Sequence, residues 1–128
     1  MNKKDIKKEE NLDFEIQFIE SVVKNRPHFV EALVALGDLY TKRGFYEKGL
    51  SIDEKLANLR PDDSMILYNL ACSYSLLNDI DKALEAIKKA IERGYNDFDY
   101  LQYDNDLENL RQDNRFQEFF VTVKKKPE

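Results

Sequence analysis

The chain has 128 residues, 25 acidic against 20 basic side chains, and a net charge of −5. This length predicts one domain with a sizeable core, and no apolar run approaches the ~20 residues that a membrane span needs. Residues 95–118 hold seven acids and two arginines, and because such an acidic segment repels phosphate, we expect no nucleic-acid partner.

Residues 1–11 are polar, and we predict a disordered or solvated arm there. No apolar signal-peptide core follows this lysine-rich start, so we expect a cytoplasmic protein, and the single cysteine fits a reducing compartment. Residues 12–26 predict an amphipathic helix that ends before Pro27. Its apolar residues recur at helical spacing: Phe14, Phe18, Ile19, Val22 and Val23.

The next 68 residues repeat at an interval of 34, the interval that separates Pro27 from Pro61. The matching pairs are Leu33 and Leu67, Leu36 and Leu70, Gly37 and Ala71, Tyr40 and Tyr74, and Gly49 and Ala83. A fixed period of this size predicts stacked helical hairpins. We expect helices over about 28–43, 46–59, 64–77 and 80–93, with left-handed turns at Gly44 and Asn78.

Small residues recur at one position in each of these four helices: Gly37, Gly49, Ala71 and Ala83. Glycine inside a helix costs about 1 kcal/mol relative to alanine, so Gly37 and Gly49 require a compensating contact. We predict that these residues let the two helices of each hairpin cross closely. After the second hairpin, Asp104 and Asp113 are expected to cap two short helices.

The spacing Leu33-x-x-Leu36-Gly37-x-x-Tyr40 and its second copy at 67–74 resemble the tetratricopeptide repeat. This resemblance implies an all-α superhelix of stacked antiparallel hairpins, with about two full repeats and capping helices at both ends. The implied single domain covers 12–123, followed by a basic tail. Its parts are 12–26 (a degenerate repeat helix), 28–61 and 62–95 (repeats), 96–123 (a C-terminal capping segment) and 124–128 (the tail). Residues 104–116 also resemble the ending D-P-D-L…L-R-x-D-P-R-F of a group of such proteins, with Asn105 and Asn114 in place of the two prolines.

The resemblance also implies a non-catalytic adaptor or scaffold that binds a peptide or helix of another protein in a concave groove. The groove positions of the family correspond here to Glu31, Val34, Ala35, Asp38, Thr41, Lys42, Met65, Tyr68, Asn69, Cys72, Ser75 and Leu76. The family's clamp for acidic C-termini needs Lys and Asn where this chain has Val34 and Asp38. We therefore expect a neutral or basic peptide. The alternative is a structural module that self-associates through exposed end helices. In solution we expect a monomer or a weak homodimer.

We expect no enzyme, cofactor or metal. His28 is the single histidine, and Cys72 has no second cysteine or nearby histidine with which to form a dyad or zinc site. The acids that begin at Asp104 do not continue as a calcium loop, because Asn109 and Arg115 occupy its sixth and twelfth positions. Asp53, at a position that is usually apolar, is either paired inside the protein or an ion-pair anchor for a partner, and we favour the internal pairing.

Overall fold

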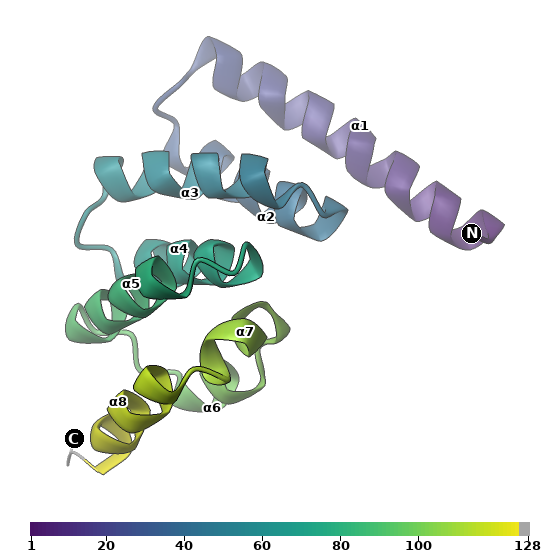
Figure 1. Ribbon diagram of the computed structural model, residues 1–128. Coiled ribbons are helices and arrows are strands. Elements are labelled where there is room, and N and C mark those ends of the chain that lie inside the picture. Colours follow the sequence, from purple (N-terminus) through teal and green to yellow (C-terminus); the bar gives the residue numbers. More distant parts are fainter. Residues whose placement is uncertain (126–128) are drawn as a thin grey trace. The chain divides into compact units, whose positions relative to one another are not determined.

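The computed structural model describes residues 1–125, and every regular element in that range is a helix (Figure 1). The chain divides into two compact units, Met1–Pro61 and Asp62–Glu128. The predicted basic tail is described as far as Lys125, and its remaining residues, 126–128, lie outside the described residues.

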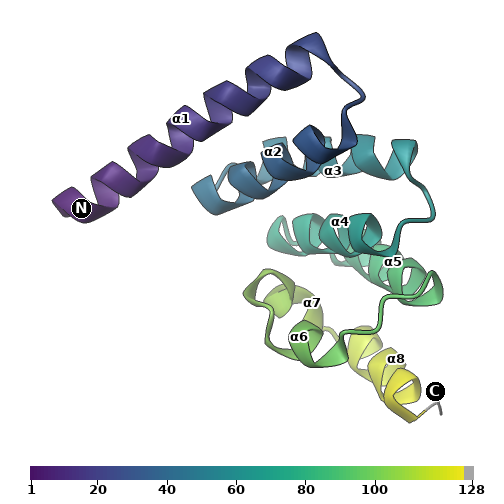
Figure 2. The ribbon, with the colours of Figure 1, turned by 180° about the vertical axis from the view of Figure 1, so that it is seen from behind.

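The first unit contains three helices: α1 (Lys3–Asn25), α2 (Val30–Arg43) and α3 (Tyr46–Leu59). Helices α2 and α3 form an antiparallel hairpin, and α1 packs against α2 (Figures 1 and 2). The buried residues at this packing are Ile16, Leu36, Leu39 and Tyr40, with Leu12, Ile19, Val23, Phe45 and Ile52 packed around them. The hydroxyl of Tyr40 also donates to Glu20, which joins the two helices by a polar contact.

Helix α1 begins earlier than predicted. The segment expected to be a disordered or solvated arm is helical from Lys3, although nearly all of its side chains are exposed. The reason is local: the Asn2 side chain accepts a hydrogen bond from the Asp5 backbone N–H at 2.9 Å, and the lysines and glutamates that follow are good helix formers. The N-terminal turns of α1 extend past the end of α2 (Figure 2).

The apolar face of α1 also differs from the predicted one. Leu12, Ile16, Ile19 and Val23 face α2, in a stripe with spacings of four, three and four residues. Phe14 and Phe18 lie away from this stripe and are 72% and 61% exposed. The prediction grouped them with Ile19 because both sets have helical spacing, but the longer continuous stripe is the one that packs.

The small residues of the first hairpin lie where its two helices meet, as predicted. A methyl group on Gly37 would lie 3.0 Å from Asp53 Oδ1 and 3.3 Å from Ile52 Cγ2 on α3. A methyl group on Gly49 would lie 3.1 Å from Thr41 Oγ1 on α2. Asp53 is 6% exposed and takes part in an interaction within the chain.

The turns that close the two hairpins are the left-handed turns that the sequence predicts. Gly44 has φ 87° and Asn78 has φ 59°. In both turns the next backbone N–H donates back to a tyrosine carbonyl, from Phe45 to Tyr40 at 2.8 Å and from Asp79 to Tyr74 at 2.9 Å. The two hairpins therefore close in the same way, one period apart.

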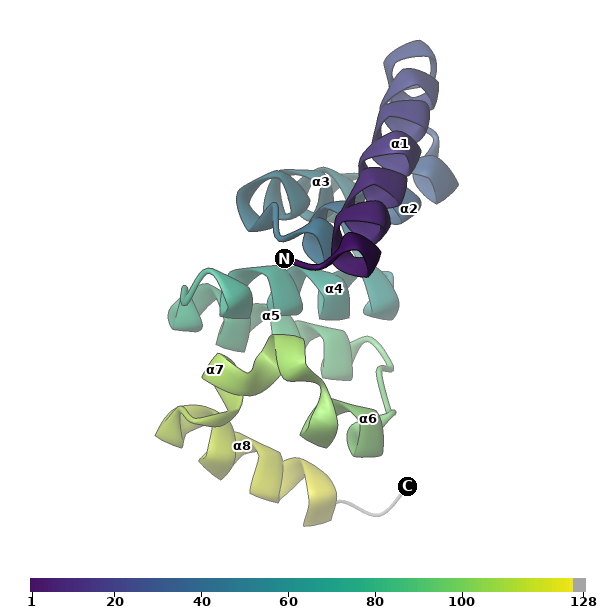
Figure 3. The ribbon, with the colours of Figure 1, turned by 90° about the vertical axis from the view of Figure 1, so that its right-hand side faces the viewer.

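The second unit begins with a hairpin of α4 (Ser64–Leu76) and α5 (Ile80–Glu92). The elements that follow it are α6 (Phe98–Tyr103), η1 (Asn105–Leu107), α7 (Glu108–Arg111) and α8 (Asn114–Lys125). Ala71 and Ala83 are fully buried, in line with their predicted role. Elements η1 and α7 pack against α4, and α7 also contacts α5 and α8 (Figure 3).

The predicted caps and the aromatic C-terminal helix complete this unit. Asp104 accepts from the Asp106 backbone N–H at 3.0 Å, and Asp113 accepts from the Arg115 backbone N–H at 2.9 Å. Phe116 and Phe120 of α8 are buried and stack with ring centroids 5.4 Å apart. Helix α8 therefore packs with these two aromatic side chains turned inward, away from solvent.

Candidate partner-binding surface

The six groove positions on α2 are open to different degrees. Glu31, Val34, Asp38 and Lys42 are exposed, and we call these four residues the α2 face. Val34 is 38% exposed, an apolar side chain between two carboxylates. Ala35 and Thr41 are half-buried.

Several polar side chains of α2 already form an ion pair or a hydrogen bond within the helix. Lys42 Nζ lies 2.9 Å from Asp38 Oδ2, one helical turn away, and this hydrogen bond raises the pKa of Lys42. Thr41 Oγ1 donates to the Gly37 carbonyl at 3.1 Å. Glu31 stands in the first turn of α2, where the helix dipole favours its negative charge. The α2 face therefore presents one apolar group flanked by Glu31 and the Asp38–Lys42 pair.

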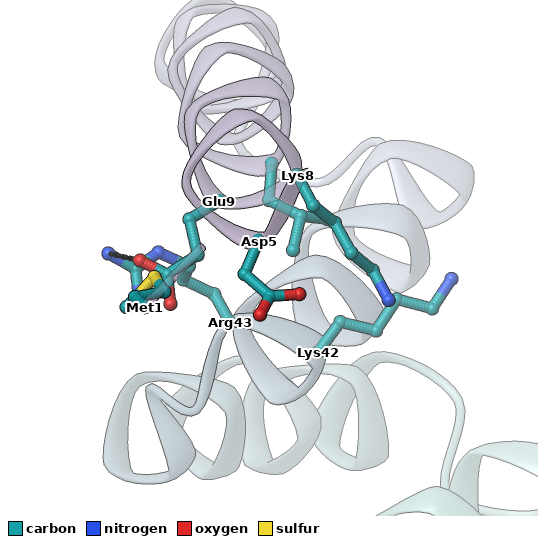
Figure 4. Close-up of a pocket in the computed structure, with 7 residues that line it drawn as sticks. Met1, Asp5, Lys8, Glu9, Lys42 and Arg43 are labelled. Atoms are coloured by element: carbon teal, nitrogen blue, oxygen red, sulfur yellow. Dashed lines mark ion pairs between the residues drawn. The ribbon is translucent and has the colours of Figure 1, made fainter. Parts of the chain in front are cut away.

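A hollow of about 370 Å³ opens beside Lys42, at the end of α2 (Figure 4). It is lined by Met1, Asp5, Lys8, Glu9, Leu12, Lys42 and Arg43. Arg43 is held there by Asp13, 2.8 Å from its Nε, and by Glu9, 3.7 Å from its guanidinium. Because charged side chains dominate the lining, this hollow suits a polar side chain of a partner better than an apolar anchor.

The α4 face comprises the other six predicted positions: Met65, Tyr68, Asn69, Cys72, Ser75 and Leu76. Half of this face is closed. Tyr68, Cys72 and Ser75 are 2%, 7% and 0% exposed. Met65 is 54% exposed, whereas Asn69 and Leu76 are half-buried.

The chain's own C-terminal segment covers Tyr68, Cys72 and Ser75. The Tyr68 hydroxyl donates to Asp104 Oδ2 at 2.6 Å, and the Cys72 thiol lies 3.8 Å from the same oxygen. Ser75 Oγ accepts from the Leu110 backbone N–H at 3.1 Å. The Ser75 carbonyl accepts from the Asn109 side-chain amide at 3.0 Å. The part of the α4 face that Tyr68, Cys72 and Ser75 form is thus occupied by residues 104–110, whereas Met65 stays exposed.

Leucines and an arginine hold this covering segment in place. Leu101, Leu107 and Leu110 are fully buried. Arg111 donates to the carbonyl of Leu101 at 2.9 Å and to that of Asp104. Helices of six and four residues are not stable alone, so their stability comes from this packing.

Tyr68 is the centre of an aromatic cluster in this covered region. Its ring stacks on Tyr95 with centroids 4.2 Å apart, and Tyr100 lies 6.3 Å away. Burial, the Cys72 thiol and the bond to Asp104 raise the pKa of Tyr68 far above its usual range. Burial also raises the pKa of Tyr95 to about 12. Both phenols are therefore neutral, structural groups.

Sequence reasoning missed that Asp104, Asn109 and Leu110 contact the α4 face. It identified this segment as a capping element but did not place it. The sequence does contain a sign of this packing. Leu101, Leu107 and Leu110 lie in a stretch with so many helix-capping aspartates and asparagines that it cannot form one long helix. Such a stretch needs another apolar surface to pack on.

The described residues contain neither a metal-binding cluster nor a helix that could span a membrane. Within residues 1–125 there is no group of three His, Cys, Asp or Glu side chains that could hold a metal ion. His28 is exposed just before α2, and Cys72 is buried. Among the helices of this range, none is long and apolar enough to cross a bilayer.

Comparisons with known proteins agree with this architecture. Residues 66–93 match the family model of the tetratricopeptide repeat. Over 80 residues, or 60% of its length, the chain is 38% identical to a chloroplastic protein of Arabidopsis thaliana, and it spans 24% of that relative.

Solved structures of MamA show the same fold. One superposes on 96% of this chain and 73% of its own with a TM-score of 0.72 at 21% identity. A double mutant of MamA from RS-1 covers 91% of this chain and 70% of its own with a TM-score of 0.64 at 18% identity. The predicted fold class is therefore confirmed: the described chain is all-α and built from helical hairpins, and its residues 66–93 match the tetratricopeptide repeat.

Proposed function

We propose that this chain is a non-catalytic interaction module that binds a peptide or helix of another protein, with the α2 face as the main contact. The observation that carries the proposal is the exposure of Glu31, Val34, Asp38 and Lys42, none of which packs in the core of the α2–α3 hairpin. The tetratricopeptide repeat at 66–93 supports a protein partner. The remaining positions contribute unequally, because Tyr68, Cys72 and Ser75 are covered by residues 104–110.

The charge of the α2 face selects the partner's chemistry. Lys42 is already paired with Asp38, whereas Glu31 adds a further carboxylate beside Val34. A segment that places a small apolar side chain on Val34 and a basic or neutral group near Glu31 is complementary to this face. An acidic C-terminus is not, because Val34 and Asp38 replace the cation and amide that a carboxylate needs. The partner that fits this face is therefore a neutral or basic peptide and not a nucleic acid. We also propose that the protein acts in the cytoplasm.

Selection from a random peptide library tests this proposal. The selected peptides are expected to be neutral or basic. The double variant Glu31→Lys, Val34→Ser should weaken their binding about tenfold or more in fluorescence anisotropy. The matched control Glu85→Lys, Val121→Ser makes the same changes at exposed residues of the second unit and should bind like the wild type. Acidic consensus peptides, or equal binding by both variants, would contradict the α2 assignment.

A second function, self-association through an exposed end helix, is favoured by one observation. Phe14 and Phe18 of α1 are 72% and 61% exposed and lie one turn apart. Exposed aromatic side chains that share a helix face are typical of contact surfaces.

A further inference from the structure

The segment that covers the α4 face stops one turn short of the start of α4. Tyr68 is 2% exposed, whereas Met65, three residues earlier on the same side of the helix, is 54% exposed. The Tyr100 ring lies 6.3 Å from the Tyr68 ring, and Tyr100 is itself 56% exposed. Met65 on α4 and Tyr100 on α6 therefore both border Tyr68 and stay open to solvent.

The outer side of α6 continues this open surface. Asp99, Tyr100 and Tyr103 are all exposed, and their spacing places them within an arc of about 100° around the helix. Tyr103 is 80% exposed, whereas Leu101 on the inner side is fully buried. We call Met65, Asp99, Tyr100 and Tyr103 the α6 surface.

The charge around the α6 surface is strongly negative. Residues 97–108 contain five acids and no base, a net charge of −5. Helix α4, on which this segment packs, has no charged side chain. Arg111 donates to the carbonyls of Leu101 and Asp104, and its inclusion leaves a net charge of 1 − 5 = −4. Such a surface attracts cations and repels phosphate and carboxylate groups.

We propose that the α6 surface binds an arginine-bearing segment of a partner protein. The guanidinium group stacks on the Tyr103 ring and donates to the Asp99 carboxylate, one turn away on α6. Neighbouring apolar atoms of the segment cover Tyr100 and Met65. This site goes beyond the α2 face and does not depend on it.

Asp99 is the carboxylate best placed for this contact. Asp97 accepts from the Tyr100 backbone N–H at 3.1 Å, and Asp104 accepts from the Tyr68 hydroxyl at 2.6 Å. Asp99 is exposed and, among the residues that the structure describes, forms no ion pair. Its oxygens are therefore open to a cation that approaches from solvent.

Other occupants fit the α6 surface less well. An apolar segment would take water from the Asp99 carboxylate without supplying a cation, which is costly. A lysine-bearing segment, such as residues 3–8 of a second copy of this chain, supplies the charge. Its ammonium group is a compact, strongly hydrated charge, whereas a planar guanidinium can stack on a ring and donate to a carboxylate at the same time. Arginine is therefore the favoured residue.

The two methionines allow a site-specific test in the full-length chain. Met65 belongs to the α6 surface, and Met1 lines the hollow of the first unit. Carbon-13 labelling of the methionine methyl groups therefore gives an NMR signal for each place. The probe is an acetylated, amidated peptide of alternating arginine and glycine. It should shift the Met65 signal in a saturable way and leave the Met1 signal unchanged.

Two matched peptides test the chemistry of the contact. A peptide of alternating lysine and glycine should bind about tenfold more weakly than the arginine peptide. A peptide of alternating glutamate and glycine should leave the Met65 signal unchanged. Equal binding of the arginine and lysine peptides would mean attraction by net charge alone and would overturn the proposal.

A double variant tests the residues. Asp99→Asn with Tyr103→Ser should weaken binding of the arginine peptide about tenfold or more, with Met65 still present as the reporter. The control Tyr46→Ser with Glu47→Gln removes one exposed aromatic ring and one carboxylate from α3 and should bind like the wild type. Circular dichroism confirms that both variants remain helical.

Three results would contradict the α6 surface: no shift of the Met65 signal, a shift of the Met1 signal alone, or equal weakening by the two double variants. The α2 face is tested separately. Glu31→Lys with Val34→Ser should leave the response of Met65 to the arginine peptide unchanged, and its loss would assign the peptide to the α2 face instead. Failure of the α6 surface leaves the α2 face untouched, because neither Asp99 nor Tyr103 lies on α2.

Discussion

Gly37→Ala tests the close approach of α2 and α3 in a way that separates two opposite expectations. In an open helical position this substitution stabilises by about 1 kcal/mol, because alanine is the better helix former. At position 37 the new methyl group would lie 3.0 Å from Asp53 Oδ1 and 3.3 Å from Ile52 Cγ2. Overpacking of this kind costs about 1–3 kcal/mol. The difference is a net loss of up to about 2 kcal/mol, with about 1 kcal/mol as the central value.

Urea denaturation followed by circular dichroism measures this loss, and a thermal melt should show a decrease in Tm of roughly 3–6 °C. The Asp53→Ala background identifies the cause. If the carboxylate is the obstacle, Gly37→Ala should cost less there than in the wild type, a coupling of about 1 kcal/mol.

Gly44→Ala is the control, because a methyl group on Gly44 would meet no atom within 4 Å and the φ of 87° makes the cost purely conformational. That cost should be the same in both backgrounds. An increase in stability on Gly37→Ala in the wild type would refute the reasoning about the α2–α3 contact.

Burial and ionisation give three further expected outcomes. Leu107→Ala should lower the free energy of unfolding by about 2–5 kcal/mol in urea denaturation, since its side chain is fully buried; a loss below about 1 kcal/mol would contradict the packing of η1. The folded state raises the pKa of Tyr68 and, to about 12, that of Tyr95, so these phenols ionise more readily in the unfolded chain. The contribution of these two phenols to stability should therefore be constant below about pH 10 and fall as the pH rises beyond it; denaturation curves that improve above that pH would give the wrong sign. Ile16→Ala should cost about 2–5 kcal/mol in a thermal melt, whereas Phe18→Ala should change stability by less than about 0.5 kcal/mol, and equal effects would contradict the orientation of α1.

The hairpins were predictable because their signals are local and repeated. Gly37 and Gly49 indicate a close contact, and the 34-residue interval aligns them with Ala71 and Ala83. The turn at Asn78 follows from the same interval, since Gly44 stands one period earlier. In these elements propensity, turn chemistry and periodicity all indicate the same structure.

Two features were not predictable from periodicity, and for different reasons. The first turns of α1, from Lys3, have no apolar side that faces the core, so the hydrophobic pattern gives no sign of a helix there. The Asn2 cap and the good helix formers that follow nevertheless suffice to extend α1. The closure over Tyr68 is a tertiary effect. The interval maps Tyr68 onto exposed Val34, but the segment that covers Tyr68 follows the last repeat and has no counterpart one period earlier.

The central claim is that residues 104–110 cover Tyr68, Cys72 and Ser75 of the α4 face while the α2 face stays open. Cys72 is the chain's single cysteine, and Asp38 is its counterpart 34 residues earlier. Native-state labelling with a thiol reagent can therefore compare the wild type with Asp38→Cys, Cys72→Ser. We predict that the thiol at 38 reacts at the rate of an exposed cysteine and that Cys72 reacts at least about a hundredfold more slowly, with equal rates in denaturant. Equal rates in the native state would contradict the account.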